Sequence, residues 1–165
     1  MAEPLRGFSF LYNMAGGQPM VIEVPVKVSQ TFSRGNVCCY SRTSGSIRVA
    51  AEADTSLLGV IEHSKSTTAT QTTATAQVIP FVPGYVFSVV GAPSTMTTAR
   101  YALRNLHADL EIPTTLYHRV DTGAATNHFR IIGWDKTNET TTGAGRTWYV
   151  TIVPAVSQFV STEAD

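Results

Sequence analysis

The sequence predicts an all-β protein, a compact antiparallel barrel or sandwich with an extended N-terminal arm and at most one short helix. Thr and Val favour strands, and 23 Thr with 17 Val make up about one residue in four. Charged residues are 15% of the chain, below the ~25% usual for soluble domains. A helical bundle would instead be rich in Leu, Glu, Lys and Ala. Apolar runs of strand length alternate with turn signals about every ten residues. We therefore expect one β domain over residues 20–165.

Residues 1–19 contain Gly and Pro at several positions, which argues against a regular element. The same segment carries five large apolar residues: Leu5, Phe8, Phe10, Leu11 and Tyr12. It is either an edge strand folded onto its own domain or an extended arm that docks on a neighbouring subunit. Fully extended, it would reach ~60 Å, far beyond a radius of gyration of ~15 Å. We treat these five residues as candidate interface residues and expect deletion of residues 1–17 to leave a folded domain that associates more weakly.

Strands are predicted throughout residues 20–62. In the first strand, apolar residues occupy alternate positions: Met20, Ile22, Val24, Val26 and Val28. Pro25 places this strand at a sheet edge or a bulge. Further strands are expected over residues 37–40, 47–51 and 57–62. Gly59, in the middle of the last of these, indicates a bulge or a close approach of two backbones.

Residues 64–76 are nearly all Ser, Thr, Ala and Gln, which predicts a loop whose second half extends into the next strand. Strands follow over residues 77–82 and 85–90. Between them, Pro83 and Gly84 occupy the central positions of a predicted type II turn. The two strands therefore form a hairpin or turn a corner.

The one candidate helix covers residues 98–110, where Ala and Leu recur at helical spacing. A bulged strand fits the middle of this segment almost as well. The remaining strands are expected over residues 116–120, 128–134 and 146–156. A polar, Thr-rich tip over residues 135–145 separates the last two.

The charge balance excludes several classes of protein. Twelve basic and twelve acidic residues give a formal net charge of zero, so the chain lacks the surplus of Lys and Arg that a nucleic-acid binder needs. Residues 1–17 hold one Arg and no sustained apolar run, which predicts no secretory signal peptide. No apolar run approaches the ~20 residues that span a bilayer, so no membrane partner is expected.

The strongest catalytic-looking motif is the run Asp121-Thr122-Gly123-Ala124. It resembles the signature of retroviral-type aspartic proteases, in which two chains each supply one aspartate. That family places the motif after a buried apolar strand, whereas His118 and Arg119 precede it here. A β-turn in which Asp caps the backbone is the better interpretation, so we expect no catalytic residue here.

Metal, thiol and phosphate chemistry find equally little support, and no cofactor is expected. His107 and Asp109 are two residues apart, as strand ligands of zinc would be, but they fall in the candidate helix. All four histidines, His63, His107, His118 and His128, are therefore interpreted as scattered residues on polar faces. Adjacent Cys38 and Cys39 are expected on opposite faces of a strand, one buried and one half-exposed. There is no glycine-rich phosphate loop.

Residues 37–156 contain three segments in a recognisable order. The strand and turn of residues 37–48 lead into Ala51-Glu52-Ala53-Asp54-Thr55-Ser56-Leu57-Leu58-Gly59-Val60. After the Thr/Ala loop comes Ala76-Gln77-Val78-Ile79-Pro80-Phe81-Val82-Pro83-Gly84-Tyr85-Val86-Phe87, and residues 129–153 form a closing hairpin. This order of segments, over residues 37–156, resembles the capsid decoration, or cement, proteins of tailed bacteriophages.

The resemblance implies a β-tulip-like domain that acts as a non-enzymatic structural virion protein. Synthesised in the host cytoplasm, it would bind the major capsid protein on the outer capsid surface as a homo-dimer or homo-trimer and stabilise the lattice. The alternative is a receptor- or carbohydrate-binding module of a phage tail or spike. That module would use Trp134, Trp148 and Tyr149 as a stacking platform, although large aromatic residues at such positions usually belong to the core.

Overall fold

A computed structural model describes residues 7–41, 43–91, 106–114, 117–122, 126–135 and 147–158. Within these ranges the regular elements are β-strands, apart from one 3-10 turn at Pro154–Val156. Among the described strands, all pairings within the sheets are antiparallel, and these sheets do not close into a barrel. The all-β prediction is therefore confirmed, and the architecture is compatible with a sandwich.

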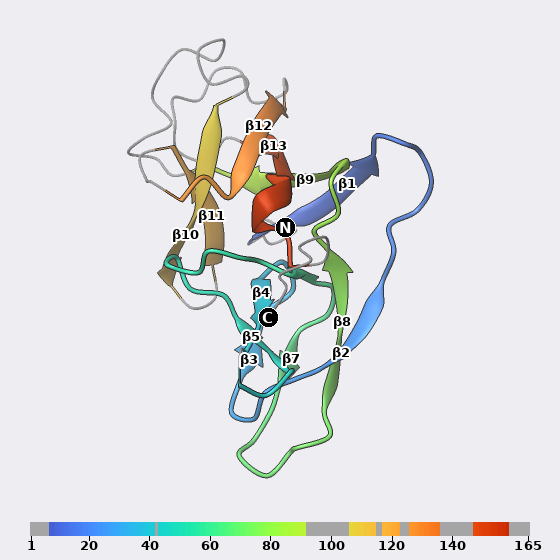
Figure 1. Cartoon of the computed structure of the whole chain (residues 1–165), viewed down its shortest axis with the longest axis vertical. Helices are drawn as coiled ribbons and strands as arrows, with labels where there is room; N and C mark the ends of the chain where they lie inside the picture. Colours follow the sequence, from blue (N-terminus) through green and yellow to red (C-terminus); the bar gives the residue numbers. More distant parts are fainter. Residues whose placement is uncertain are drawn as a thin grey trace, which may run out of the picture.

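The larger sheet has six strands in the order β1-β9-β13-β12-β10-β11 and occupies the upper half of Figure 1. Its strands are β1 (Ser9–Asn13), β9 (Tyr85–Val90), β13 (Thr147–Ile152), β12 (Phe129–Trp134), β10 (His107–Thr114) and β11 (Tyr117–Asp121). The edges of this sheet are thus β1, from the start of the described chain, and β11.

The smaller sheet has five strands in the order β2-β8-β6-β4-β5 and lies in the lower half of Figure 1. Its strands are β2 (Ile22–Pro25), β8 (Thr75–Pro80), β6 (Gly59–Ile61), β4 (Val37–Tyr40) and β5 (Ile47–Val49). The short strands β3 (Thr31–Phe32) and β7 (Lys65–Ser66) pair separately. The two edges of the five-stranded sheet approach each other where Val26 bridges Ile47 and Lys27 donates a backbone hydrogen bond of 2.9 Å to the Ile47 carbonyl.

Two cores lie on opposite faces of the smaller sheet. The first lies where the two sheets meet and combines Val60 and Ile79 of the smaller sheet with Phe87 and Trp148 of the larger one. The second contains Val24, Phe32, Ile47 and Val78 and is confined to the smaller sheet and its flanking segments. Strands buried on both faces need apolar residues at consecutive positions, which explains the uninterrupted apolar run through β6.

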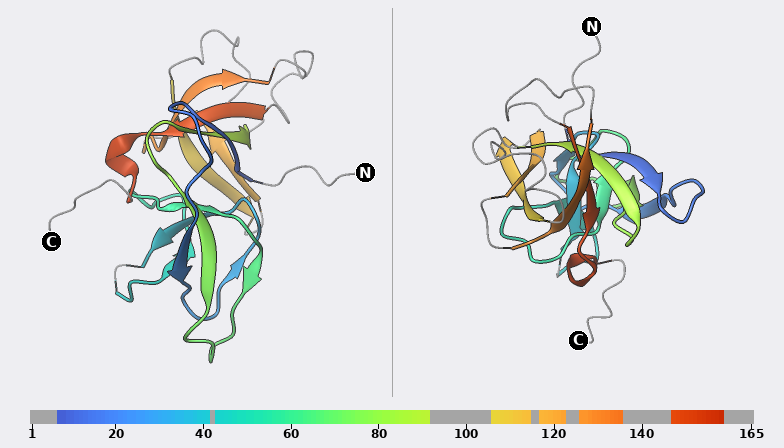
Figure 2. Two further views of the ribbon diagram at one scale, coloured as in Figure 1. Left: turned by 90° about the vertical axis from the view of Figure 1, so that its right-hand side faces the viewer. Right: turned by 90° about the horizontal axis from the view of Figure 1, so that it is seen from above.

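The chain passes from the smaller sheet to the larger sheet at Pro83-Gly84. The Tyr85 N–H donates to the Val82 carbonyl at 3.0 Å, and Gly84 has φ of 94°, as a type II turn requires. Of the two predicted outcomes, the structure has the corner, because β8 and β9 belong to different sheets. In the left view of Figure 2, β12 and β13 lie across the upper half at a steep angle to β8.

Two predictions drawn from single residues of the smaller sheet are confirmed. Pro25 ends β2, which is an edge strand. Gly59 is in close contact with the neighbouring strand, since a Cβ atom there would lie 2.8 Å from the Cα of Pro80 and still closer to the Ile79 carbonyl. Only glycine permits this approach of two backbones.

The predicted helix over residues 98–110 is wrong in its described part, because residues 107–110 begin strand β10. This segment pairs with β11 on one side and β12 on the other, so its backbone hydrogen bonds are made between strands. Tertiary pairing therefore outweighs the helical spacing of Ala and Leu. Residues 98–105 lie outside the described residues. The loop predicted over 64–76 is interrupted by β7 at its start and ends in β8.

Candidate interface on the edge of the larger sheet

The described part of the N-terminal segment is an edge strand of its own domain. β1 pairs with β9, with Phe10 opposite Phe87. Phe8 is only 3% exposed, and its ring lies 5.0 Å from that of Phe129 in the core. The Phe10 ring is half-buried and lies 5.4 Å from the ring of Tyr85. Phe8 therefore does not serve an interface as predicted, because the chain's own core buries it.

Leu11 and Tyr12 differ from the two phenylalanines in being exposed, by 42% and 45%. Leu5, the fifth predicted interface residue, lies outside the described residues. Among the described residues six large apolar side chains are exposed, and five of them fall between positions 11 and 21. We call these five the β1 patch: Leu11, Tyr12, Met14, Met20 and Val21. Clustered exposed apolar residues are typical of interaction surfaces.

Backbone contacts bring the two halves of the β1 patch together around the start of β9. The Met14 N–H donates to the Gly84 carbonyl at 3.0 Å, and the Met20 N–H donates to the Tyr85 hydroxyl at 3.0 Å. Between them, the Asn13 side chain accepts from the Ala15 N–H at 3.0 Å and donates to the Gly16 carbonyl at 2.8 Å. The connection is therefore held in place while its apolar side chains face outward.

Three of the five patch residues escaped the prediction. The apolar alternation predicts Met20 on the buried face of the following strand, but that strand begins at Ile22, so the alternation does not extend to Met20. Met14 stands beside a run of glycines that indicates a turn. No signal in the sequence marks either methionine as exposed, because both would suit a core equally well.

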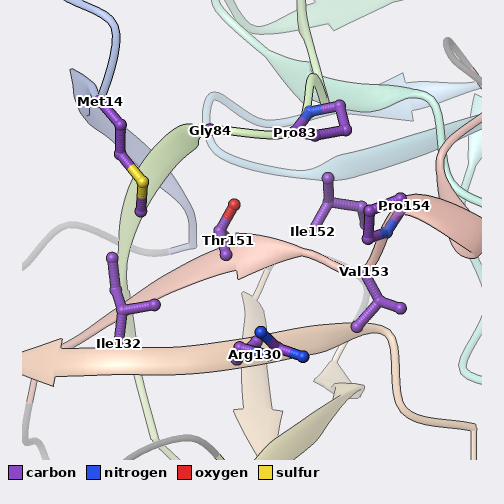
Figure 3. Close-up of a pocket in the computed structure, with 9 residues that line it drawn as sticks. All are labelled: Met14, Pro83, Gly84, Arg130, Ile132, Thr151, Ile152, Val153 and Pro154. Carbon is purple, nitrogen blue, oxygen red and sulfur yellow. The ribbon is translucent and has the colours of Figure 1, made fainter.

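A groove lies directly beside the β1 patch and has a volume of about 420 Å³. Its lining comes from four segments of the chain: Met14, Pro83, Gly84, Arg130, Ile132 and residues 151–154. Figure 3 shows Met14 and Ile132 extending toward each other from opposite sides, with Thr151 of β13 between the two walls. The β1 patch and the groove thus form one continuous candidate interface.

Among the described residues that line the groove, two have polar side chains, Arg130 and Thr151. Arg130 of β12 is exposed and makes no ion pair with any described residue. Thr151 stands opposite Arg130 in the register of β12 and β13, and its hydroxyl oxygen is buried without a hydrogen-bond partner in the described part of the chain. Tyr149 precedes Thr151 on β13. Burial raises the pKa of Tyr149, and the nearby side chains of Asp135 and Tyr12 raise it further. The phenol of Tyr149 therefore stays protonated at neutral pH.

The described part of the protease-like run, Asp121 and Thr122, lies at the end of strand β11. Asp121 is the last residue of β11 and stands opposite Asp109 of β10 in the register. Asp109 is buried and accepts backbone hydrogen bonds from Thr126 at 3.0 Å and His128 at 3.3 Å. Those bonds give the Asp109 carboxylate a structural role in holding the start of β12. Gly123 and Ala124 lie outside the described residues.

The prediction that all four histidines occupy polar faces is wrong for two of them. His63 and His107 are exposed, but His118 and His128 are fully buried. The ring of His128 accepts from the Leu110 N–H at 3.1 Å, and its other nitrogen bonds to the Asp54 carbonyl at 2.6 Å. Ring nitrogens of these two buried histidines make hydrogen bonds to distant segments of the chain, and the sequence pattern did not reveal them. No group of three metal-ligating side chains occurs within the described ranges.

Cys38 and Cys39 point to opposite faces of β4, as predicted, but both are buried. Cys38 belongs to the core of the smaller sheet and Cys39 to the core between the sheets. The Cys39 thiol donates to Asp54 at 3.3 Å, and burial raises the pKa of this thiol to about 12. Burial also raises the pKa of Cys38. Both thiols therefore stay protonated and unreactive at neutral pH.

The aromatic platform proposed for sugar binding does not exist as such. Trp148 is fully buried, and its ring lies 6.3 Å from that of Trp134, which packs against the same core. Tyr149 points to the other face of β13 and is half-buried. Trp148 thus contributes to the core, where large aromatic residues provide most of the buried area.

Neither protein-family models nor curated protein sequences give a match to this chain. Within the described part of the chain, no helix is long and apolar enough to cross a membrane.

Proposed function

We propose that this chain is a non-enzymatic structural virion protein that binds the outer surface of a major capsid lattice and stabilises it. The observation that supports the proposal is the concentration of exposed apolar side chains in the β1 patch. The resemblance of residues 37–156 to phage cement proteins suggests the partner, the major capsid protein. The zero net charge agrees with this function, because copies packed on one lattice repel each other little.

The size of the β1 patch favours attachment through several copies. Each of its five side chains is roughly half exposed, so covering one contributes about 1 kcal/mol and covering all five about 5 kcal/mol. Immobilising one copy costs at least about 4 kcal/mol. A single copy therefore binds weakly, whereas a homo-dimer or homo-trimer on a repeating surface gains from high effective concentration.

Side-chain contacts, not strand addition, are expected at this interface. Although β1 is an edge strand, its register with β9 shifts between Phe10 and Tyr12. An irregularity of this kind interrupts the row of backbone groups that a partner strand would need. The exposed side chains of Leu11 and Tyr12 lie at the same place and offer the contact surface instead.

The proposal is tested on purified, DNA-filled particles from infected cells. We expect the chain among their proteins, and we expect Leu11→Ser with Tyr12→Ser to weaken its co-sedimentation with particles that lack it. Thr70→Ala with Thr72→Ala, at exposed positions between β7 and β8, is the matched control and should bind normally. Abundance in infected cells combined with absence from full particles would exclude the proposal. Retention on a glycan column without particle binding would instead favour a receptor- or carbohydrate-binding module.

A further inference from the structure

We propose that the groove beside the β1 patch binds a short peptide segment that carries an apolar side chain and a neighbouring carboxylate. The proposal deepens the proposed function and rests on it, since a capsid subunit would supply the segment. It adds the chemistry by which the partner is recognised. The shape of the groove, its apolar walls and its two polar side chains favour such a ligand.

The shape of the groove suits a short segment. Its volume of about 420 Å³ falls in the range of small-ligand sites and holds a few residues of a peptide. The walls come from Met14 on one side and Ile132 on the other (Figure 3). Met14 is 56% exposed and Ile132 is half-buried, so an apolar side chain between them would cover both. Its burial would provide the hydrophobic part of the affinity.

The polar side chains of the groove select for negative charge. Arg130 and Thr151 are cross-strand partners, so their side chains stand next to each other on one face of the sheet. A guanidinium is always charged and binds a carboxylate through two parallel hydrogen bonds. No acidic residue is among the described residues that line the groove, and within the same part of the chain the exposed Arg130 has no ion-pair partner.

Thr151 adds a second hydrogen-bond donor on the same face of the sheet, and Figure 3 shows its hydroxyl oxygen directed toward Gly84, away from Arg130. Its hydroxyl oxygen is buried and makes no hydrogen bond within the described part of the chain. An unsatisfied buried polar group is unfavourable, and an acceptor that enters the groove would satisfy it. An anionic oxygen bound by Arg130 would lie on the same face of the sheet as Thr151. An ammonium group, by contrast, offers no hydrogen-bond acceptor and would be repelled by the charge of Arg130. Acidic ligands are therefore preferred over basic ones.

The test uses two peptides that differ only in charge, acetyl-Ala-Leu-Asp-Ala-amide and the same peptide with Asn in place of Asp. Each is titrated into the full-length chain while backbone amide signals are followed by NMR. We expect the Asp peptide to shift the amide signals of Arg130, Ile132 and Thr151 and to bind about fivefold more tightly than the Asn peptide. Equal affinities, or shifts confined to other parts of the chain, would overturn the proposal.

Variants assign the preference to the groove. Arg130→Gln should remove the difference between the two peptides, and Thr151→Val should weaken binding of the Asp peptide. Arg34→Gln is the matched control, because Arg34 is an exposed arginine whose nearest carboxylate, that of Glu62, is 3.7 Å away. A charge preference that survives Arg130→Gln would refute the assignment. Binding of hexanoate with neither peptide bound would also refute it, in favour of a small carboxylate.

The two proposals fail in different ways. If the groove prefers the Asp peptide but the chain is absent from full particles, the groove remains a peptide site and the proposed virion function falls. If the chain is present in particles, and Arg130→Gln co-sediments with them as well as the unchanged chain, the groove is not the recognition site. In that case the β1 patch alone would account for attachment.

Discussion

Acid should loosen the junction between the two sheets at His118, a residue of β11. Its ring accepts a hydrogen bond of 3.0 Å from the backbone N–H of Val37, on β4 of the other sheet. The second ring nitrogen is buried and has no hydrogen-bond partner among the described residues. A protonated ring would lose the bond from Val37 and would place a positive charge in an apolar setting. Burial therefore lowers the pKa of His118 from 6.5 to about 4.

The direction and size of the effect follow from the two protonation states. Because the pKa is lower in the folded chain, the unfolded chain binds the proton first as the pH falls below 6.5. His118 has no effect on stability well above pH 6.5, lowers it increasingly between pH 6.5 and pH 4, and adds no further loss below that. Between pH 7.5 and pH 4.5 the free energy of unfolding should fall by about 2.5 kcal/mol on account of this residue. That is a large part of the ~5–15 kcal/mol typical of a domain.

Urea unfolding at pH 7.5, 6.5, 5.5 and 4.5 measures this contribution. His118→Gln cannot be protonated, so its stability should fall less steeply with pH, by up to about 1.4 kcal/mol per pH unit. His63→Gln, at an exposed histidine, should behave like the unchanged chain. The salt bridge from Arg48 lowers the pKa of Asp54 despite its partial burial, so acid protonates Asp54 only at lower pH, outside this window.

A second measurement covers the case in which His118→Gln fails to fold. The ring protons of His118 in the unchanged chain should titrate near pH 4 by NMR. Titration of the ring near 6.5, or equal pH slopes for the unchanged chain and His118→Gln, would refute the reasoning. Either result would mean that the ring is accessible to water in the folded chain.

Three further predictions concern the core and the close contacts. Phe8→Ala should lower the free energy of unfolding by about 3–5 kcal/mol, whereas Leu11→Ala in the β1 patch should change it by less than about 1 kcal/mol; equal effects would contradict the assignment of Phe8 to the core. Gly59→Ala should cost about 2–3 kcal/mol in thermal or urea unfolding, and Gly133→Ala, whose added Cβ would lie 3.5 Å from Tyr149, should cost much less. Both cysteines should resist a thiol reagent at pH 8 in the folded chain and react once it is unfolded; rapid reaction of the folded chain would show that they are exposed.

Deletion of residues 1–17, expected from the sequence to leave a folded domain that associates more weakly, is expected from the structure to destabilise the domain itself. Removing residues 1–17 would take away β1 and the buried ring of Phe8, which contacts Phe129. The glycines and prolines of this segment predict an irregular chain, and this prediction is confirmed for residues 14–19. It fails for residues 9–13, which form the edge strand β1, because an edge strand and a free arm have the same local composition.

Local chemistry determined a good part of the fold. Pro83 and Gly84 specify their turn through allowed backbone angles, and Gly59 marks a close approach because no other residue fits there. Alternation put Cys38 and Cys39 on opposite faces of one strand, as the structure has them. These features depend on one residue and its immediate neighbours, so the sequence is sufficient to predict them.

Burial and the candidate interface were decided by the tertiary structure. His118 is buried because β11 packs against β4, and the same histidine on an edge facing solvent would be an ordinary surface residue. The groove draws its lining from segments more than a hundred residues apart, from Met14 to Pro154. Met14 is exposed, although methionine suits a core equally well, because its backbone is bound to the corner at Gly84. Which faces meet depends on the sum of many weak contacts between distant residues, and no local pattern along the chain contains that sum.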